Sequence, residues 1–145
     1  LISKSSGVAI AAANGPRAVV LSGDAKEIAE LRETLAGKGI AAQMLTVSHA
    51  FHSPLMDPML DEFEQIAQGI HHHAPQVDLI SNVTGTCLEP SDRITADYWR
   101  RHVRGTVRFA DGVASLMNRK PAALLEAGPD PVEPAPLPAP CRRLP

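Results

Sequence analysis

Aromatic residues, cysteines and long apolar runs are all scarce in this chain of 145 residues. Phe, Trp and Tyr together make up 3% of the sequence, and the two cysteines are Cys87 and Cys141. Two cysteines do not make a disulfide framework, so the sequence predicts a reducing, cytoplasmic location. No apolar run approaches the roughly 20 residues that cross a bilayer. A net charge of −2 argues against a dominant role in binding nucleic acid or a membrane surface.

Two further features are missing from the sequence. The first residues lack the basic-then-apolar order of a signal peptide, and without an initiator Met we expect the chain to begin inside a longer protein. The sequence also lacks a nucleophile elbow of the form Gly-x-Ser-x-Gly, which a serine hydrolase or acyltransferase on an α/β scaffold needs. Ser22 precedes Gly23, but Val20 stands where the first glycine would be. We therefore expect any such nucleophile to lie outside the chain.

The residues that are present are typical of a globular domain, since 44% are hydrophobic and 21% are charged. Two apolar runs, residues 8–13 and 18–22, flank an Asn-Gly-Pro turn and predict a β-hairpin. Asp24 followed by Glu27 predicts the start of a helix. Residues 40–47 are again apolar and predict a third strand. The first part of the chain is therefore predicted to be a β-β-α-β unit of the α+β kind.

Ser53 and Pro54 predict the start of the next helix, as its N-cap and first helical residue. Apolar residues at helical spacing indicate that this helix packs into the core; they are Leu55, Met59, Phe63, Ile66 and Ile70. From Pro129 onward the chain is rich in proline, so we expect an extended, disordered end. Further strands are predicted at 77–81 and 122–126, and further helices at 97–103 and 109–117.

The stretch Ser-His-Ala-Phe-His-Ser-Pro-Leu-Met, residues 48–56, combines two histidines with one of the few aromatic residues. His52 lies directly before the predicted N-cap, where the helix dipole disfavours an imidazolium ion. A neutral imidazole is what a general base must be. His52 is therefore a candidate base, although a histidine near a helix start is more often structural or merely exposed.

Two other groups of residues are weaker candidates for a binding site. Three consecutive histidines, residues 71–73, cannot all point one way, and we expect no metal site there. Five arginines surround the Tyr-Trp pair at 98–99 and form either a solvated basic face or a surface for an anion. They are Arg93, Arg100, Arg101, Arg104 and Arg108.

Four stretches occur in a distinctive order: residues 48–56, Ser-Asn-Val-Thr-Gly at 81–85, Tyr-Trp-Arg-Arg-His-Val-Arg-Gly-Thr-Val-Arg-Phe-Ala-Asp-Gly-Val at 98–113, and Leu-Leu-Glu-Ala-Gly-Pro-Asp-Pro-Val at 124–132. Together they resemble the acyltransferase domain of modular type I polyketide synthases, which is similar to malonyl-CoA:acyl carrier protein transacylases. Residues 8–24 resemble the same family. The resemblance implies that the chain is the C-terminal portion of such a domain.

The resemblance implies an α/β fold, in which a ferredoxin-like small subdomain of the α+β kind is inserted into an α/β-hydrolase-like core. Residues 1–47 would be part of the small subdomain and residues 48–132 the C-terminal part of the large one. Residues 133–145 would be a Pro-rich disordered tail, where the sequence departs from the family pattern.

The family's reaction transfers a malonyl extender unit from CoA to the phosphopantetheine thiol of an acyl carrier protein. A serine forms the acyl-enzyme and a histidine serves as base and then as acid. The resemblance implies that the chain binds no cofactor of its own. Malonyl-CoA is the implied substrate, and the carrier domain and a neighbouring ketosynthase domain are the implied partners.

The resemblance places the family's catalytic histidine on His52 and its substrate-specificity motif on His49, Ala50, Phe51 and His52. This motif is similar to the malonyl-selective version, because Phe51 fills space that a smaller residue would leave for a 2-methyl branch. Asn82 would support the active site, or else be a buried residue of a turn. The serine, the arginine for the malonyl carboxylate and the oxyanion donors are absent from the chain. The isolated chain is therefore expected to be inactive, and an inactive remnant or interaction module is the alternative.

Overall fold

The computed structural model describes residues 7–89 and 91–125. Strands β1 (Val8–Gly15) and β2 (Ala18–Gly23) form an antiparallel pair, so the predicted hairpin is confirmed. Residue Val107 joins the other edge of β1 in a short parallel bridge, with its N–H bonded to the Ala11 carbonyl at 2.8 Å. This bridge ties the hairpin to a segment almost 100 residues later in the chain.

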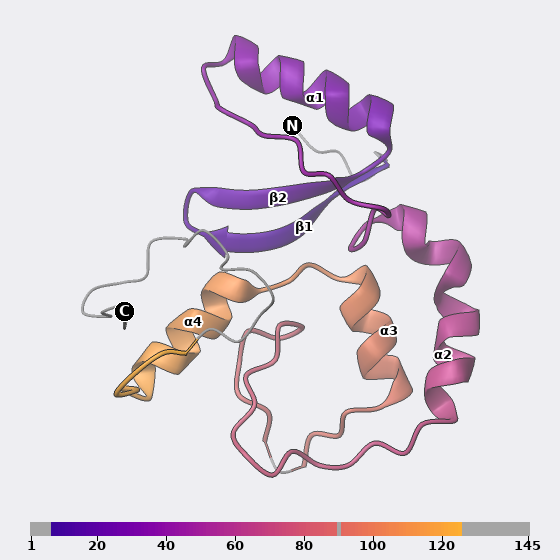
Figure 1. The fold of residues 1–145 in the computed structure, drawn as a ribbon, viewed down its shortest axis with the longest axis vertical. Helices are drawn as coiled ribbons and strands as arrows, with labels where there is room; N and C mark the ends of the chain where they lie inside the picture. Colours follow the sequence, from indigo (N-terminus) through magenta and orange to yellow (C-terminus); the bar gives the residue numbers. More distant parts are fainter. Residues whose placement is uncertain (1–6, 90, 126–145) are drawn as a thin grey trace.

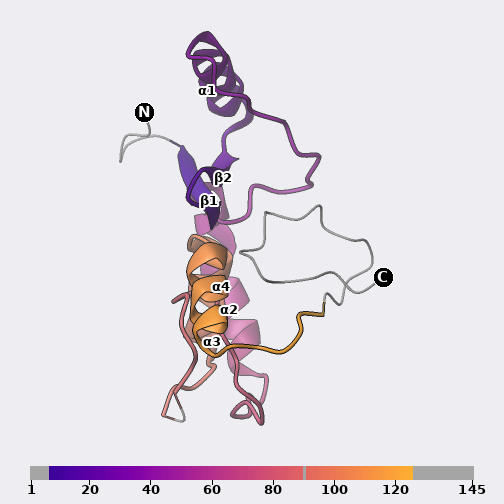
Figure 2. The same cartoon turned by 90° about the vertical axis from the view of Figure 1, so that its left-hand side faces the viewer.

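Helix α1 (Ala25–Gly37) follows the hairpin, as predicted. The carboxylate of Asp24 caps it by accepting hydrogen bonds from the backbone N–H groups of Lys26 and Glu27. Figures 1 and 2 show α1 on the far side of the hairpin from the other helices. None of its residues is buried, and the strand that it packs against is β2 of the hairpin.

Residues 40–47 do not form the predicted third strand, and they run as an exposed segment between α1 and the next helix. The large apolar side chains of this segment are open to solvent; they are Ile40, Met44, Leu45 and Val47. Strand formation requires hydrogen bonds to a neighbouring strand. Within the described residues the sheet has two strands, β1 and β2, and this segment pairs with neither.

The helix predicted at Ser53 begins there, but its first part is a 3₁₀ turn, η1 (Pro54–Met59), which continues into α2 (Leu60–Gln68). The hydroxyl of Ser53 accepts the Leu55 N–H at 3.3 Å, so the predicted N-cap is confirmed.

The predicted core stripe of this helix is wrong. Met56, Leu60 and Ala67 are buried, whereas Leu55, Ile66 and Ile70 are exposed and Met59 and Phe63 are half-buried. The 3₁₀ turn has three residues per turn rather than 3.6, which changes the face that the helix presents to its neighbour.

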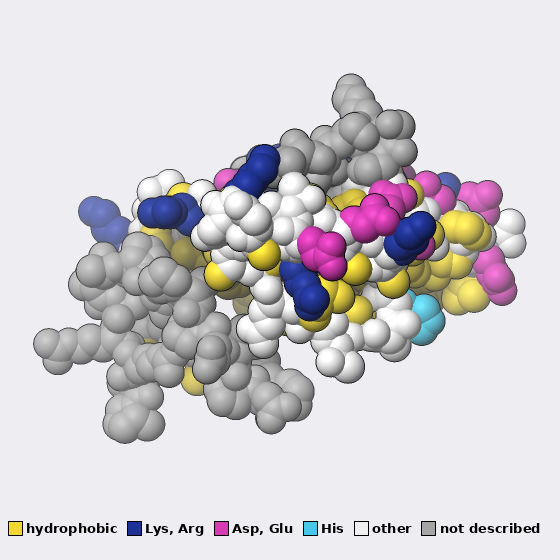
Figure 3. Space-filling view, turned by 90° about the horizontal axis from the view of Figure 1, so that it is seen from above, with side chains coloured by type: hydrophobic (Ala, Val, Ile, Leu, Met, Phe, Trp, Pro, Cys, Tyr) yellow, Lys and Arg dark blue, Asp and Glu magenta, His cyan; other side chains and the backbone are white. Residues whose placement is uncertain are grey.

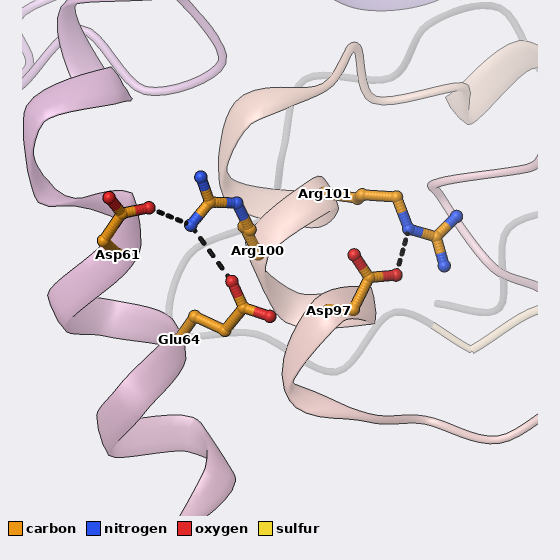
Figure 4. Close-up of polar contacts among 5 residues, drawn as sticks. All are labelled: Asp61, Glu64, Asp97, Arg100 and Arg101. Carbon is orange, nitrogen blue, oxygen red and sulfur yellow. Dashed lines mark hydrogen bonds and ion pairs between the residues drawn. The ribbon is translucent and has the colours of Figure 1, made fainter.

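Helix α3 (Ala96–Arg104) packs beside α2, and an arginine links the two helices. The Arg100 guanidinium lies between two carboxylates of α2 and donates to Asp61 at 2.7 Å and to Glu64 at 3.0 Å (Figure 4). Its hydrogen bond with Asp61 raises the pKa of Arg100 above its usual value. On the other side of α3, Arg101 pairs with Asp97 at 2.9 Å.

The loop between residues 77 and 89 is held by a buried pair of hydroxyl groups. Ser81 is 1% exposed, and its hydroxyl is hydrogen-bonded at 2.9 Å to the hydroxyl of Tyr98 on α3, which is 8% exposed. The strand predicted at 77–81 is reduced to a single bridge between Ile80 and Cys87, because the chain turns back at Gly85, whose φ is +75°.

Helix α4 (Phe109–Asn118) confirms the last predicted helix. Residues 122–125 form no strand, and the rest of that predicted strand lies outside the described residues, as does the Pro-rich tail at 133–145. Figure 3, which views the molecule from the α1 end, shows hydrophobic side chains open to solvent between the charged ones. The described part of the chain therefore has a small core and a large apolar surface.

We expect Ser81→Ala to destabilise the fold by about 1–3 kcal/mol, because it leaves the buried Tyr98 hydroxyl without its partner. The free energy of unfolding, measured by urea denaturation, checks this. The matched control is the double variant Ser81→Ala/Tyr98→Phe, which removes both hydroxyl groups and should recover much of the loss. A double variant as unstable as the sum of the two single variants would contradict the role given to this hydrogen bond.

Candidate active site

His52 occupies an unusual backbone conformation at the end of the loop before η1. Its φ of 63° lies in the left-handed region, which costs a residue other than glycine on the order of 1–3 kcal/mol. The C-terminal end of α3 holds it there. The His52 N–H donates to the Val103 carbonyl at 3.0 Å, and the ring Nδ1 lies 2.8 Å from the Gly105 carbonyl oxygen.

The bond to Gly105 determines which ring nitrogen of His52 carries the hydrogen. A carbonyl oxygen can only accept, so Nδ1 must be the protonated nitrogen in the neutral ring. Nε2 is then left with its lone pair available to take a proton. A backbone carbonyl thus gives His52 the tautomer and the orientation of a general base.

Within the predicted specificity motif, the Phe51 ring lies near both the His49 and the His52 rings. The Phe51 ring centroid lies 6.5 Å from that of His52 and 6.0 Å from that of His49. Phe51 is 46% exposed, so its ring can contact a further molecule or another part of the protein. The backbone of the motif is held by Ser53, which is fully buried and donates its hydroxyl hydrogen to the Ala50 carbonyl at 2.6 Å.

Asn82 is exposed, so the interpretation of this residue as a buried turn residue is wrong. Its backbone carbonyl accepts the Arg108 N–H at 2.9 Å. Asn82 also lines a cavity of about 240 Å³ that includes Gly105, whose carbonyl binds His52. The other residues of the cavity wall are Val83, Arg101, His102, Thr106, Val107 and Arg108. The structure therefore brings Asn82 to the same small cavity as the support of His52.

His102, on α3, is a neighbour of His52 that the sequence reasoning missed. The two ring centroids are 6.1 Å apart and the rings meet edge to face. Burial, and secondarily the charge of His52, lower the pKa of His102 below its usual value. A signal was present in the sequence, because His102 follows Tyr98 by four residues and Trp99 by three, and side chains at these spacings meet on a helix.

The arginines near α3 do not form an unpaired basic face. Each of four arginines is paired with a carboxylate; the pairs are Arg100 with Asp61 and Glu64, Arg101 with Asp97, Arg104 with Asp57, and Arg108 with Asp111. Such pairs fix side chains more than they attract a further anion.

Within residues 7–89 and 91–125, the structure holds neither a cluster of metal ligands nor a membrane-spanning helix. No three His, Cys, Asp or Glu side chains there lie close enough to hold a metal ion. No helix in the same residues is both long and apolar enough to cross a membrane.

Comparison with known sequences identifies the family of the chain. The family described as "Acyl transferase domain" matches residues 1–142. Polyketide synthase GfsA of Streptomyces halstedii is 44% identical over 126 residues, which are 87% of this chain and 2% of that protein. Mycoketide-CoA synthase of Mycobacterium tuberculosis is 48% identical over 122 residues, 84% of this chain and 3% of that synthase. The chain therefore spans a small fraction of the length of these relatives.

Solved structures give the same relationship. The acyltransferase domain from the second module of the salinomycin polyketide synthase is 46% identical and superimposes with a TM-score of 0.70, over 79% of this chain and 27% of that one. A loading acyltransferase from the avermectin modular polyketide synthase is 30% identical, with a TM-score of 0.73 over 81% of this chain and 36% of that one. These likenesses confirm an α/β acyltransferase fold.

The comparisons do not bear out the prediction that the chain is the C-terminal portion of the domain. The family match begins at residue 1 and continues to residue 142, and it gives no support to that placement. The family match over residues 1–142 and the similarity to polyketide synthases and their solved acyltransferase domains lead to one conclusion. The chain belongs to the acyl transferase domain family, in the form found in polyketide synthases.

Proposed function

We propose that this chain supplies the general base and the acyl-selecting loop of a domain that transfers malonyl units from CoA to the phosphopantetheine thiol of an acyl carrier protein. The observation that carries the proposal is the His52 ring, whose Nδ1 is bound to the Gly105 carbonyl at 2.8 Å and whose Nε2 is free to accept a proton. The family membership supports acyl transfer, and the nature of the relatives supports a carrier domain and a ketosynthase as neighbours.

The proposed reaction has two matched steps. In the first, Nε2 of His52 takes the proton of a serine hydroxyl supplied by a part of the domain outside these residues. The serine oxygen attacks the thioester carbonyl, and the CoA thiolate leaves and receives that proton from the imidazolium. In the second, Nε2 takes the proton of the carrier thiol, the thiolate attacks the acyl-serine ester, and the serine oxygen regains the proton. His52 thus ends each step neutral.

The loop that carries His52 is also proposed to select the acyl group. The Phe51 ring lies next to the base, and the His49 ring lies beside Phe51, so a substrate bound for attack passes close to Phe51. A phenylalanine at this point occupies volume that a branch at carbon 2 of the acyl chain would need. Asn82 is assigned a supporting role, because it lines the cavity that includes Gly105.

Phe51→Ser in the complete domain should shift selection toward methylmalonyl-CoA. Since one methyl group in a pocket is worth about 1–3 kcal/mol, the ratio of kcat/KM for methylmalonyl over malonyl should rise about 10- to 200-fold. Competition between the two substrates measures this ratio. Leu55→Ser is the matched control, because Leu55 is exposed and lies outside the motif. An unchanged ratio in Phe51→Ser would show that other residues set the pocket.

The proposed function is tested with radiolabelled malonyl-CoA. The complete domain should become labelled and pass the label to a carrier protein, whereas the 145-residue chain alone should stay unlabelled because it has no Gly-x-Ser-x-Gly elbow. Stable labelling of the isolated chain would contradict the assignment of the nucleophile to another part of the domain. A complete domain that takes up no acyl group would instead favour a remnant or interaction module without catalysis.

A further inference from the structure

A column of side chains connects the loop that carries Asn82 to the His52 ring. It begins at the buried Ser81 hydroxyl, which is bonded to the Tyr98 hydroxyl at 2.9 Å. The Tyr98 ring lies 6.1 Å from the His102 ring, and the His102 ring lies 6.1 Å from the His52 ring. Each contact in this column involves a residue of α3, so the column fixes the His52 ring relative to that helix.

His52 needs such support, because its conformation is strained and its hydrogen bonds restrain only one edge of the ring. The backbone φ of 63° is unfavourable for histidine. The bond from Nδ1 to Gly105 restrains rotation of the ring, but a half-turn of the imidazole would break that bond and turn Nε2 away from its position. A ring packed against the imidazole opposes that half-turn.

His102 can provide this packing, because it is itself held in place. Tyr98 is 8% exposed and hydrogen-bonded, and Trp99 packs edge to face on His102 with ring centroids 5.8 Å apart. Burial lowers the pKa of His102 below its usual value, which favours the uncharged ring near neutral pH. It therefore packs beside His52 without repelling the imidazolium that forms when His52 takes a proton.

We propose that His102 is a positioning residue for His52: its ring, fixed by Tyr98 and Trp99, keeps the His52 imidazole in the orientation in which Nδ1 faces Gly105 and Nε2 faces the substrate. This inference rests on the proposed function only for its kinetic consequence. The orientation of the ring is a property of the protein without substrate.

The test compares His102→Ala with His102→Phe in the complete domain that contains this chain. In His102→Ala the gap beside His52 should lower kcat for malonyl transfer about 10- to 100-fold, because small displacements of reacting groups have effects of that size. The KM for malonyl-CoA should change less than about twofold, because His102 is not proposed to touch the substrate. His102→Phe keeps an aromatic ring and should restore most of kcat. His72→Ala, a half-buried histidine outside the site, is the matched control and should behave as the parent domain.

The second readout is the ¹⁵N NMR spectrum of the histidine rings without substrate. In the parent domain and in His102→Phe, the His52 signals should show hydrogen on Nδ1 and none on Nε2 at a pH where the ring is neutral. In His102→Ala they should move toward an average of the two tautomers. An unchanged His52 spectrum in His102→Ala would overturn the proposal.

The two readouts separate this inference from the proposed function. If the parent domain transfers no malonyl group, the proposed function fails, while the NMR comparison still decides whether His102 orients His52. If His102→Phe is as impaired as His102→Ala in both readouts although both variants unfold at the parent temperature, packing is not the role of His102 and the proposal is wrong.

Discussion

His52→Ala in the complete domain is expected to lower the rate of malonyl transfer by a factor of about 10²–10⁴, the usual contribution of a positioned acid–base group. The substitution removes Nε2, which is proposed to take the serine proton in the first step and the thiol proton in the second. Both formation and discharge of the acyl-enzyme should therefore slow. Rapid-quench measurement of the labelled domain, with and without carrier protein, follows the two steps separately.

His49→Ala is the matched control for this experiment. His49 belongs to the same loop, but its Nδ1 is bonded to the neighbouring Ser48 hydroxyl at 3.0 Å rather than to α3. We expect it to retain most of the rate, with its effect confined to the choice of acyl group. A His52→Ala domain that transfers malonyl at the parent rate would remove His52 from the mechanism.

The parts of the fold that the sequence predicted well are those that depend on neighbours along the chain. Asp24 and Ser53 were recognised as helix caps from local patterns, and both make the expected side-chain bonds. A cap involves groups two or three residues apart, so the pattern and the structure concern the same residues. The hairpin is local in the same way, because a short turn joins its strands.

The wrong predictions concern elements whose pairing or packing partners are distant along the chain or lie outside the described residues. Residues 40–47 have the composition of a strand, but a strand needs a neighbouring edge, and the composition does not supply one. The η1 turn buries Met56 and the α2 helix buries Leu60, rather than the predicted stripe, because the 3₁₀ turn changes the periodicity that the prediction assumed constant. Periodicity predicts an apolar face, whereas the neighbouring element decides which residues are covered.

In the candidate site, too, local features could be predicted from the sequence and contacts with distant residues could not. The sequence predicted His52 as a base from its place beside a helix start. The structure adds the group that selects the ring's tautomer and orientation, the Gly105 carbonyl, which lies 53 residues later. No local pattern around His52 indicates that carbonyl. The spacing of His102 from Tyr98 and Trp99 indicates that these three side chains meet on α3, but it does not indicate that His102 lies beside His52. The sequence therefore singled out His52, whose role as the base stays a prediction, while the groups that orient its ring could not be read from the sequence.

Gly105→Ala tests the role of that carbonyl. An added Cβ at residue 105 would lie 2.8 Å from the Arg101 carbonyl oxygen, which is closer than such atoms approach in folded proteins. The Arg101 oxygen belongs to the backbone, and the Cβ is bonded directly to the backbone of residue 105. The contact is therefore relieved only by moving the end of α3. The Gly105 carbonyl moves with it and its bond to Nδ1 of His52 lengthens. Because a displacement of about 1 Å near the reacting groups costs on the order of 10²-fold in rate, we expect kcat to fall by that factor.

Gly37→Ala provides the matched control, because no atom lies within 4 Å of the Cβ that it would add at the end of α1. This variant should keep the parent rate and stability. In Gly105→Ala the ¹⁵N signals of His52 should lose the pattern of a ring protonated only on Nδ1, in parallel with kcat. If the rate falls while the His52 tautomer is retained, the carbonyl is not what orients the base, and the loss arises from some other movement of α3. If both stay at the parent values, the end of α3 absorbs the methyl group and the hydrogen bond to Gly105 has no part in holding His52.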